Sequence, residues 1–241
     1  LQRRGLIAES IEVAEGTMTL AKEVGDPMRI AQAHRALGIG YSLCGRIPEA
    51  RMEIEAGVRI MRTLDDKPRL ANALGALGEV DRLEGRISQA RASYEEALAL
   101  LRNAGDLDGL SIMLLNLAMV AIDAGEVEGA RGRLREAASI SEKIKGKYIG
   151  TAAVTIAGAL AAASGDSQRA PHFWGAAAEA RERMGVLLDP PDAMFLEPHV
   201  ARVRAELGAA AFETAERGGR AVPHESALAE VRAWLEGSRG G

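Results

Sequence analysis

The chain has 241 residues, and its 30 Lys and Arg against 34 Asp and Glu leave a formal net charge of −4. Hydrophobic residues make up 47% but aromatic residues only 3%, so Ala and Leu must supply most of the core, which favours close-packed helices over sheets. The acidic balance excludes the basic footprint of a nucleic-acid-binding protein. No apolar run reaches the ~18 residues of a membrane span.

A forty-residue repeat runs through the sequence. Its glycines are Gly5, Gly45, Gly85, Gly125 and Gly165. Five residues later, the alanine column consists of Ala50, Ala90, Ala130 and Ala170. Seven residues earlier, the small-residue column consists of Gly38, Gly78, Ala118 and Gly158. A fixed period of this length indicates stacked supersecondary units.

Residues 1–24 are predicted to be the second helix of a truncated leading repeat, because Gly5 belongs to the series. The sequence begins at Leu1 and not at Met, inside that repeat. We therefore expect it to be a piece of a longer protein; a processed mature chain is the alternative.

Four helix pairs are predicted next, at about 25–66, 67–106, 107–146 and 147–186. In the first pair, Asp26-Pro27 provides an N-cap followed by a proline at the first helical position. Gly45 stands where a left-handed residue would end the first helix. The second helix begins near Ile47. Each pair is thus an αα-hairpin of helices of about sixteen residues, with the small-residue column expected to face the alanine column.

Residues 187–241 are predicted to form a C-terminal helical cap, since the repeat stops after about Met184. One helix should follow Pro190-Pro191 and run to about Leu207, a second should end at Gly218-Gly219, and an amphipathic helix should close the chain. Terminal units of a solenoid are atypical because they hide the exposed end of the stack.

The module around Gly78 resembles the tetratricopeptide repeat (TPR). The matching residues are Leu77-Gly78, Gly85, Ala90, Tyr94 and Ala97-Leu98. The resemblance implies an all-α fold, a right-handed α-solenoid of stacked antiparallel helix pairs. The chain departs from the family in two ways: its period is forty, where the usual one is 34, and the first-helix aromatic residue is absent. His34, Leu74, Leu114 and Val154 take its place.

Residues 165–236 resemble the C-terminal end of large bacterial signal-transduction ATPases of LuxR-type or cyclase-linked transcriptional regulators. The residues that carry the likeness are Phe173-Trp174-Gly175, Arg181, Met184-Gly185, Pro190-Pro191, Leu207-Gly208 and Ala211-Phe212. This resemblance implies an ATPase and an output domain elsewhere in the same longer chain.

A catalytic constellation is missing from the sequence. There is no G-x-x-x-x-G-K-[ST] motif, and the four histidines lack metal-ligand spacing. Cys44 lies on an apolar stripe, which predicts a buried small hydrophobe. Arg51, Arg91 and Arg131 recur at forty residues among glutamates, which predicts a solvated outer ridge. We expect no enzyme activity, no cofactor and no metal.

The TPR resemblance implies that the first helix of each pair lines a concave groove. The candidate binding residues are Gln32, Arg35, Ile39, Asn72, Glu79, Arg82, Ile112, Leu115, Met119 and Ile122. The last four form an apolar stripe that is too large to stay open. A partner helix, a second copy in a homodimer, or the C-terminal helices with Leu196, Val200 and Phe212 would cover it. The last of these is preferred.

Two functions fit these observations. One is a regulatory arm of a larger bacterial signalling ATPase or transcriptional regulator, in which a protein, a peptide or a small effector binds the groove. The other is a stand-alone TPR adaptor that scaffolds a protein complex. The single Cys44 suits a reducing cytoplasm.

Overall fold

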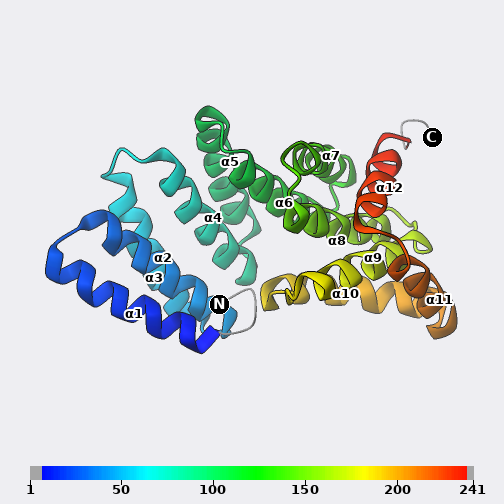
Figure 1. Ribbon diagram of the computed structural model, residues 1–241, viewed down its shortest axis with the longest axis horizontal. Coiled ribbons are helices and arrows are strands. Elements are labelled where there is room, and N and C mark those ends of the chain that lie inside the picture. The colour runs from blue at the N-terminus through cyan, green and yellow to red at the C-terminus, as the bar shows by residue number, and fades with distance from the viewer. Residues whose placement is uncertain (1–6, 238–241) are drawn as a thin grey trace. The chain divides into compact units, whose positions relative to one another are not determined.

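The computed structural model describes residues 7–237, and all regular structure in that range is helical (Figure 1). The helices are α1 (Ile7–Val24), α2 (Pro27–Leu43), α3 (Ile47–Arg62), α4 (Lys67–Leu83), α5 (Ile87–Ala104), α6 (Leu107–Asp123), α7 (Val127–Ile144), α8 (Lys147–Ala163), α9 (Arg169–Met184), α10 (Pro190–Leu207), α11 (Ala209–Arg220) and α12 (His224–Gly237). The predicted all-α solenoid is confirmed. Gly5 lies outside the described residues.

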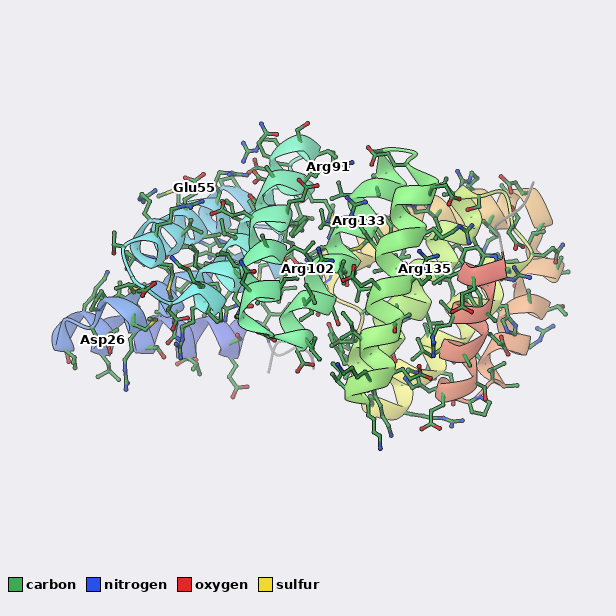
Figure 2. All side chains as sticks on the ribbon, turned by 90° about the horizontal axis from the view of Figure 1, so that it is seen from above. Asp26, Glu55, Arg91, Arg102, Arg133 and Arg135 are labelled. Carbon is green, nitrogen blue, oxygen red and sulfur yellow. The ribbon has the colours of Figure 1, made fainter. Side chains whose placement is uncertain are left out.

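Aspartate side chains start three of the first helices. Asp26, labelled in Figure 2, accepts hydrogen bonds from the backbone N–H of Met28 at 3.0 Å and of Arg29 at 3.2 Å. Asp66 and Asp106 do the same at α4 and α6. These caps satisfy N–H groups that have no partner inside the helix. They fix the starts of α2, α4 and α6, whereas α8 begins after Gly146 without a side-chain cap.

The phased glycines end the first helix of each pair in the left-handed conformation. The φ angles are 73° at Gly45, 73° at Gly85, 74° at Gly125 and 80° at Gly165. A second column, twenty residues away, ends helices in the same way at Gly25, Gly105, Gly185 and Lys145. Among the described residues, Lys145 is the non-glycine with positive φ, a conformation that costs an L-residue about 1 kcal/mol or more.

The small-residue column makes room for large side chains of the second helix. A Cβ on Gly38 would lie 2.3 Å from Cγ1 of Ile54, and one on Gly78 would lie 2.6 Å from Cε1 of Tyr94. The expected contact with the alanine column is also present but is the longer one. The carbonyl oxygen of Ala50 would lie 3.0 Å from a Cβ on Gly38. Glycine is needed so that the two helices can approach with the larger residue between them.

The chain forms two compact units. The N-terminal unit comprises Leu1–Gly109 with Asp189–Pro191, and the C-terminal unit comprises Leu110–Leu188 with Asp192–Gly241. In the first, α1 to α5 pack consecutively, each on the next. In the second, α7 packs on α8 and α8 on α9, while α11 packs on α9 and α12 on α7, α8 and α9.

One predicted helix end is wrong. Gly218 and Gly219 do not end α11, which includes both and continues to Arg220. The reason is tertiary: Gly219 lies against the backbone of α9, so this glycine serves a close helix contact and not a turn.

Candidate functional site

The candidate groove residues of the N-terminal unit are only partly available to a partner. On α2, Gln32, Arg35 and Ile39 are half-buried. On α4, Asn72 is exposed and Glu79 is half-buried, whereas Arg82 is buried. The surface open to a partner on these two helices is therefore mainly polar, with Ile39 as its apolar member.

Arg35 differs from the other half-buried arginines of this unit. Within residues 7–237 its guanidinium has no hydrogen bond or ion pair, and burial lowers the pKa of Arg35. Gln32, one turn earlier on α2, likewise has no side-chain hydrogen bond in that range. These two side chains keep their hydrogen-bonding capacity for another molecule.

An ion-pair cluster that the sequence did not reveal joins α3 to α4. Asp81 is buried and accepts from Arg51 Nη2 at 2.7 Å and from Arg86 Nε at 3.0 Å. Arg51 Nε also donates to Glu84 at 3.1 Å, and its Nη1 donates to Glu55, which Figure 2 labels on α3. These two arginines are paired with carboxylates of the same unit and are not free to bind a partner.

The predicted solvated ridge is wrong, because none of its three arginines is exposed: Arg51 and Arg91 are half-buried and Arg131 is buried. Arg51 is half-buried in this cluster. Arg131 is buried, with its guanidinium carbon 4.7 Å from the centre of the Trp234 ring. A long arginine side chain can pack its methylene groups against a neighbouring helix while its guanidinium contacts a carboxylate, as in Arg51, or an aromatic ring, as in Arg131. A sequence period alone does not distinguish that arrangement from an exposed face.

Cys44 is also placed differently from the prediction. It is exposed at the C-cap of α2 and not buried. Cys44 follows the last residue of α2, Leu43, and precedes the left-handed Gly45, so it no longer continues the apolar side of the helix. His34 lies beside its helix pair, where its Nδ1 lies 2.7 Å from Glu53 Oε2 on α3.

The apolar stripe on α6 lies mostly inside the C-terminal unit. Leu115, Met119 and Ile122 are 4%, 3% and 4% exposed, whereas Ile112 is 36% exposed. On α10, Phe195, Leu196 and Val203 are buried. His199 of α10 lies 4.0 Å from Asp123, the last residue of α6. A role of this stripe in binding stays a prediction.

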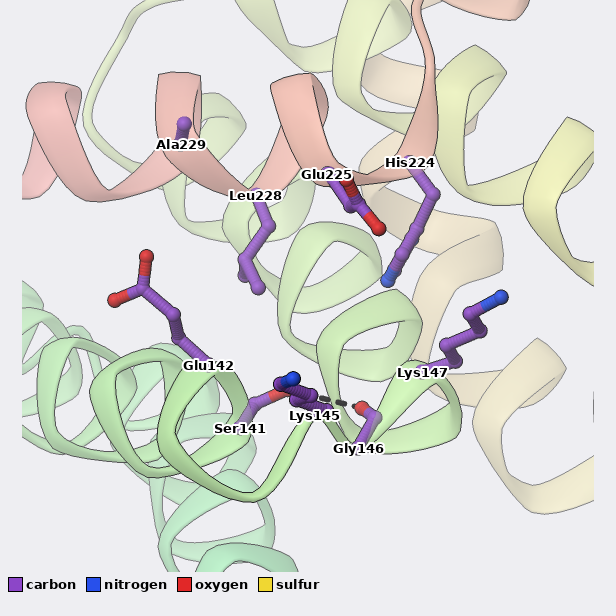
Figure 3. Close-up of a pocket in the computed structure, with 9 residues that line it drawn as sticks. All are labelled: Ser141, Glu142, Lys145, Gly146, Lys147, His224, Glu225, Leu228 and Ala229. Atoms are coloured by element: carbon purple, nitrogen blue, oxygen red, sulfur yellow. Dashed lines mark hydrogen bonds between the residues drawn. The ribbon is translucent and has the colours of Figure 1, made fainter.

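A cavity of about 500 Å³ lies in the C-terminal unit between the α7–α8 turn and the start of α12 (Figure 3). His224 points from α12 towards α8, where its Nδ1 lies 3.4 Å from Thr151 Oγ1. Thr151 already donates to the carbonyl of Lys147, so it accepts from the histidine. The lining mixes Lys145 and Lys147 with glutamates, so no single ligand charge is favoured.

Mild acid should destabilise the C-terminal unit. Burial, with a smaller contribution from Arg202, lowers the pKa of His199; burial, with Lys147, lowers the pKa of His224. The unfolded chain therefore binds more protons than the folded one below about pH 6.5, and stability falls as the pH drops from there towards the folded pKa values.

Urea unfolding at pH 7.5, 6.5 and 5.5 measures this loss. The variants His199→Gln and His224→Gln should each flatten the dependence on pH. An unchanged slope in both variants would show that these two histidines do not cause it.

Between residues 7 and 237 no group of three or more His, Cys, Asp or Glu could hold a metal ion. No helix in the same range is long and apolar enough to cross a membrane.

Comparison with known proteins supports the repeat assignment. Residues 29–103 match the tetratricopeptide repeat family. No curated protein matches the chain. Among solved structures, the crystal structure of BtubC (BKLC) from P. vanneervenii is similar with a TM-score of 0.61 and 19% identity, covering 98% of this chain and 94% of that one. At this identity the likeness concerns the fold alone. Residues 29–103 are therefore similar to tetratricopeptide repeats, and the described part of the chain is an array of helical repeats.

Proposed function

We propose that the chain is a non-catalytic protein-interaction array that binds a partner through the polar face of α2 and α4. The observation that carries this proposal is the state of Gln32, Arg35 and Asn72. All three have no internal side-chain hydrogen bond or ion pair within residues 7–237, on helices that are otherwise packed. Polar side chains without internal partners on a rigid scaffold are suited to recognising another molecule.

The double variant Gln32→Ala/Asn72→Ala tests this face. Neither side chain has an internal hydrogen bond, so folding and thermal stability should be unchanged. Affinity purification from lysate of the source cells should recover a specific partner with the wild-type chain and lose it with the variant. Arg59→Ala, on the exposed side of α3, is the matched control. Equal recovery by the wild type and both variants would place the function elsewhere.

We further propose that this array is the regulatory arm of a larger cytoplasmic signalling ATPase or transcriptional regulator. The likeness of residues 165–236 to the C-terminal ends of such proteins supports this, as does the single cysteine. A P-loop ATPase encoded upstream in the same reading frame would agree with it. A short protein containing only repeats would favour the stand-alone adaptor.

If the arm senses a small effector, the effector should stabilise the folded chain. A ligand present at a hundred times its Kd adds about 2.7 kcal/mol to the free energy of unfolding. A thermal-shift screen with common metabolites measures this directly.

A further inference from the structure

The last helix pair departs from the forty-residue pattern at the cavity between the α7–α8 turn and α12. On α8, Gly150 stands in the column that holds the buried Leu70 and Leu110 in earlier pairs. On α7, Ser141 stands in the column of the buried Leu101. Two large apolar side chains of the repeat are thus replaced by small ones, and the space they would fill is free for another group.

The imidazole of His224 enters this space and is held in one tautomer. A Cβ on Gly150 would lie 3.1 Å from Nε2 of His224 and 3.0 Å from Oγ of Ser141. Thr151 Oγ1 lies 3.4 Å from His224 Nδ1 and gives its own proton to the carbonyl of Lys147. The ring therefore donates from Nδ1, and Nε2 keeps a lone pair. Within residues 7–237 this Nε2 has no hydrogen-bond partner.

The turn between α7 and α8 carries a lysine in an unfavourable backbone conformation at the same cavity. Lys145 has φ 53° and ψ 37°, whereas Gly25, Gly105 and Gly185 end helices in this left-handed conformation elsewhere in the array. Glycine adopts it without strain. Strained residues of this kind cluster at functional sites and ligand clamps. The ammonium of Lys145 has no ion pair in the described part of the chain.

The walls of the cavity differ in charge. The wall at the turn carries Lys145 and the start of α8, which has no side-chain cap and therefore attracts negative charge. The wall at α12 carries Glu225, whose carboxylate has no ion pair among the described residues. The other glutamate of the lining, Glu142, is engaged by Arg232. Leu228 adds an apolar surface and points from α12 towards the turn (Figure 3).

We propose that this cavity binds a free amino acid with an aliphatic side chain. The carboxylate of the ligand pairs with Lys145 at the start of α8. Its ammonium donates to Glu225 and to Nε2 of His224, and its side chain packs on Leu228. The cavity volume of about 500 Å³ lies in the range of about 300–1,000 Å³ that is usual for small-molecule sites.

This inference goes beyond the proposed function. The cavity belongs to the C-terminal unit, whereas the polar face of α2 and α4 belongs to the N-terminal unit. It adds a second site and names the chemical class of a small effector.

A thermal-shift screen of the whole chain with each standard L-amino acid, followed by calorimetry, tests the proposal. Leucine, isoleucine, valine or methionine should raise the melting temperature. The N-acetyl derivative of the best ligand lacks the ammonium, and the corresponding alkylamine lacks the carboxylate. Each should bind at least tenfold more weakly than the free amino acid, because one of the two charged walls then has no partner.

Lys145→Gly separates binding from folding. The Kd of the amino acid should rise at least tenfold, because the ammonium of Lys145 is lost. The melting temperature of the free chain should rise, because glycine adopts the left-handed conformation without strain. Glu225→Gln should weaken binding by a similar factor. Lys143→Gln is the matched control, because it removes an exposed lysine of the same helix end that does not line the cavity.

Three outcomes would overturn the proposal: no amino acid raises the melting temperature, the N-acetyl derivative binds as tightly as the free amino acid, or the Kd is indifferent to both Lys145→Gly and Glu225→Gln. The second would mean that the cavity recognises an anion alone. Gln32→Ala/Asn72→Ala should bind the amino acid as the wild type does. Failure of this inference leaves partner recovery through α2 and α4 unaffected, so the two proposals fail separately.

Discussion

Gly219→Ala is expected to detach α11 from α9 and to cost about 3 kcal/mol, the upper end of the usual range for overpacking. A Cβ at this position would lie 1.8 Å from the carbonyl oxygen of His172 on α9. The contact is reciprocal, because a Cβ on Gly175 of α9 would lie 2.1 Å from the carbonyl oxygen of Glu216 on α11. Both obstacles are backbone atoms, which cannot rotate away as a side chain can, so the helices must separate.

Neighbouring contacts would be lost with that separation. Phe212 is buried on α11, with its ring centroid 6.3 Å from that of Trp174. Arg220 at the end of α11 pairs with Glu182 of α9 at 3.0 Å. Urea unfolding measures the loss in stability, and limited proteolysis between residues 207 and 224 reports the release of α11.

Gly218→Ala is the matched control. The nearest atom to a Cβ there is His172 Nδ1 at 3.8 Å, an ordinary contact. Because alanine favours a helix interior over glycine, this variant should gain about 0.5–1 kcal/mol. Equal stability of the two alanine variants would mean that α9 and α11 do not approach as closely as described.

Leu115→Asp and Met119→Asp are each expected to cost about 3–5 kcal/mol, and together to unfold the C-terminal unit or release α10. Both side chains are almost fully buried on α6. Each substitution removes apolar packing and buries a carboxylate without a partner. Rapid proteolysis within residues 190–207, compared with the wild type, would report the release of α10.

Ile112→Asp provides the control on the same helix. Ile112 is 36% exposed, so its carboxylate would reach water, and the cost should stay near 1 kcal/mol. Should Leu115→Asp and Met119→Asp keep the wild-type stability and protease resistance, the stripe would be open in solution. It would then be available to a partner as an open groove.

The accuracy of the sequence-based predictions follows the range of the interactions involved. Gly45 and Asp26 were predicted correctly because a left-handed turn and a helix cap depend on residues within four positions. Cys44 and Arg51 were predicted wrongly. The exposure of Cys44 depends on the turn at Gly45, and the burial of Arg51 depends on Asp81, thirty residues further along the chain.

The candidate site shows the same division. The resemblance to a TPR array selected Arg35 and Arg82 as equivalent groove residues, yet Arg82 is buried and Arg35 has no partner in the described range. Nothing in the local sequence separates the two.

The sequence by itself determined the repeat, the helix pairs and the turns of this protein, because these depend on short-range backbone geometry repeated every forty residues. Only the tertiary structure decided which charged residues are paired, that the α6 stripe is buried, and that Gly175 and Gly219 bring α9 and α11 into backbone contact. These features depend on which helices meet and at what distance, and residues far apart in the chain set both.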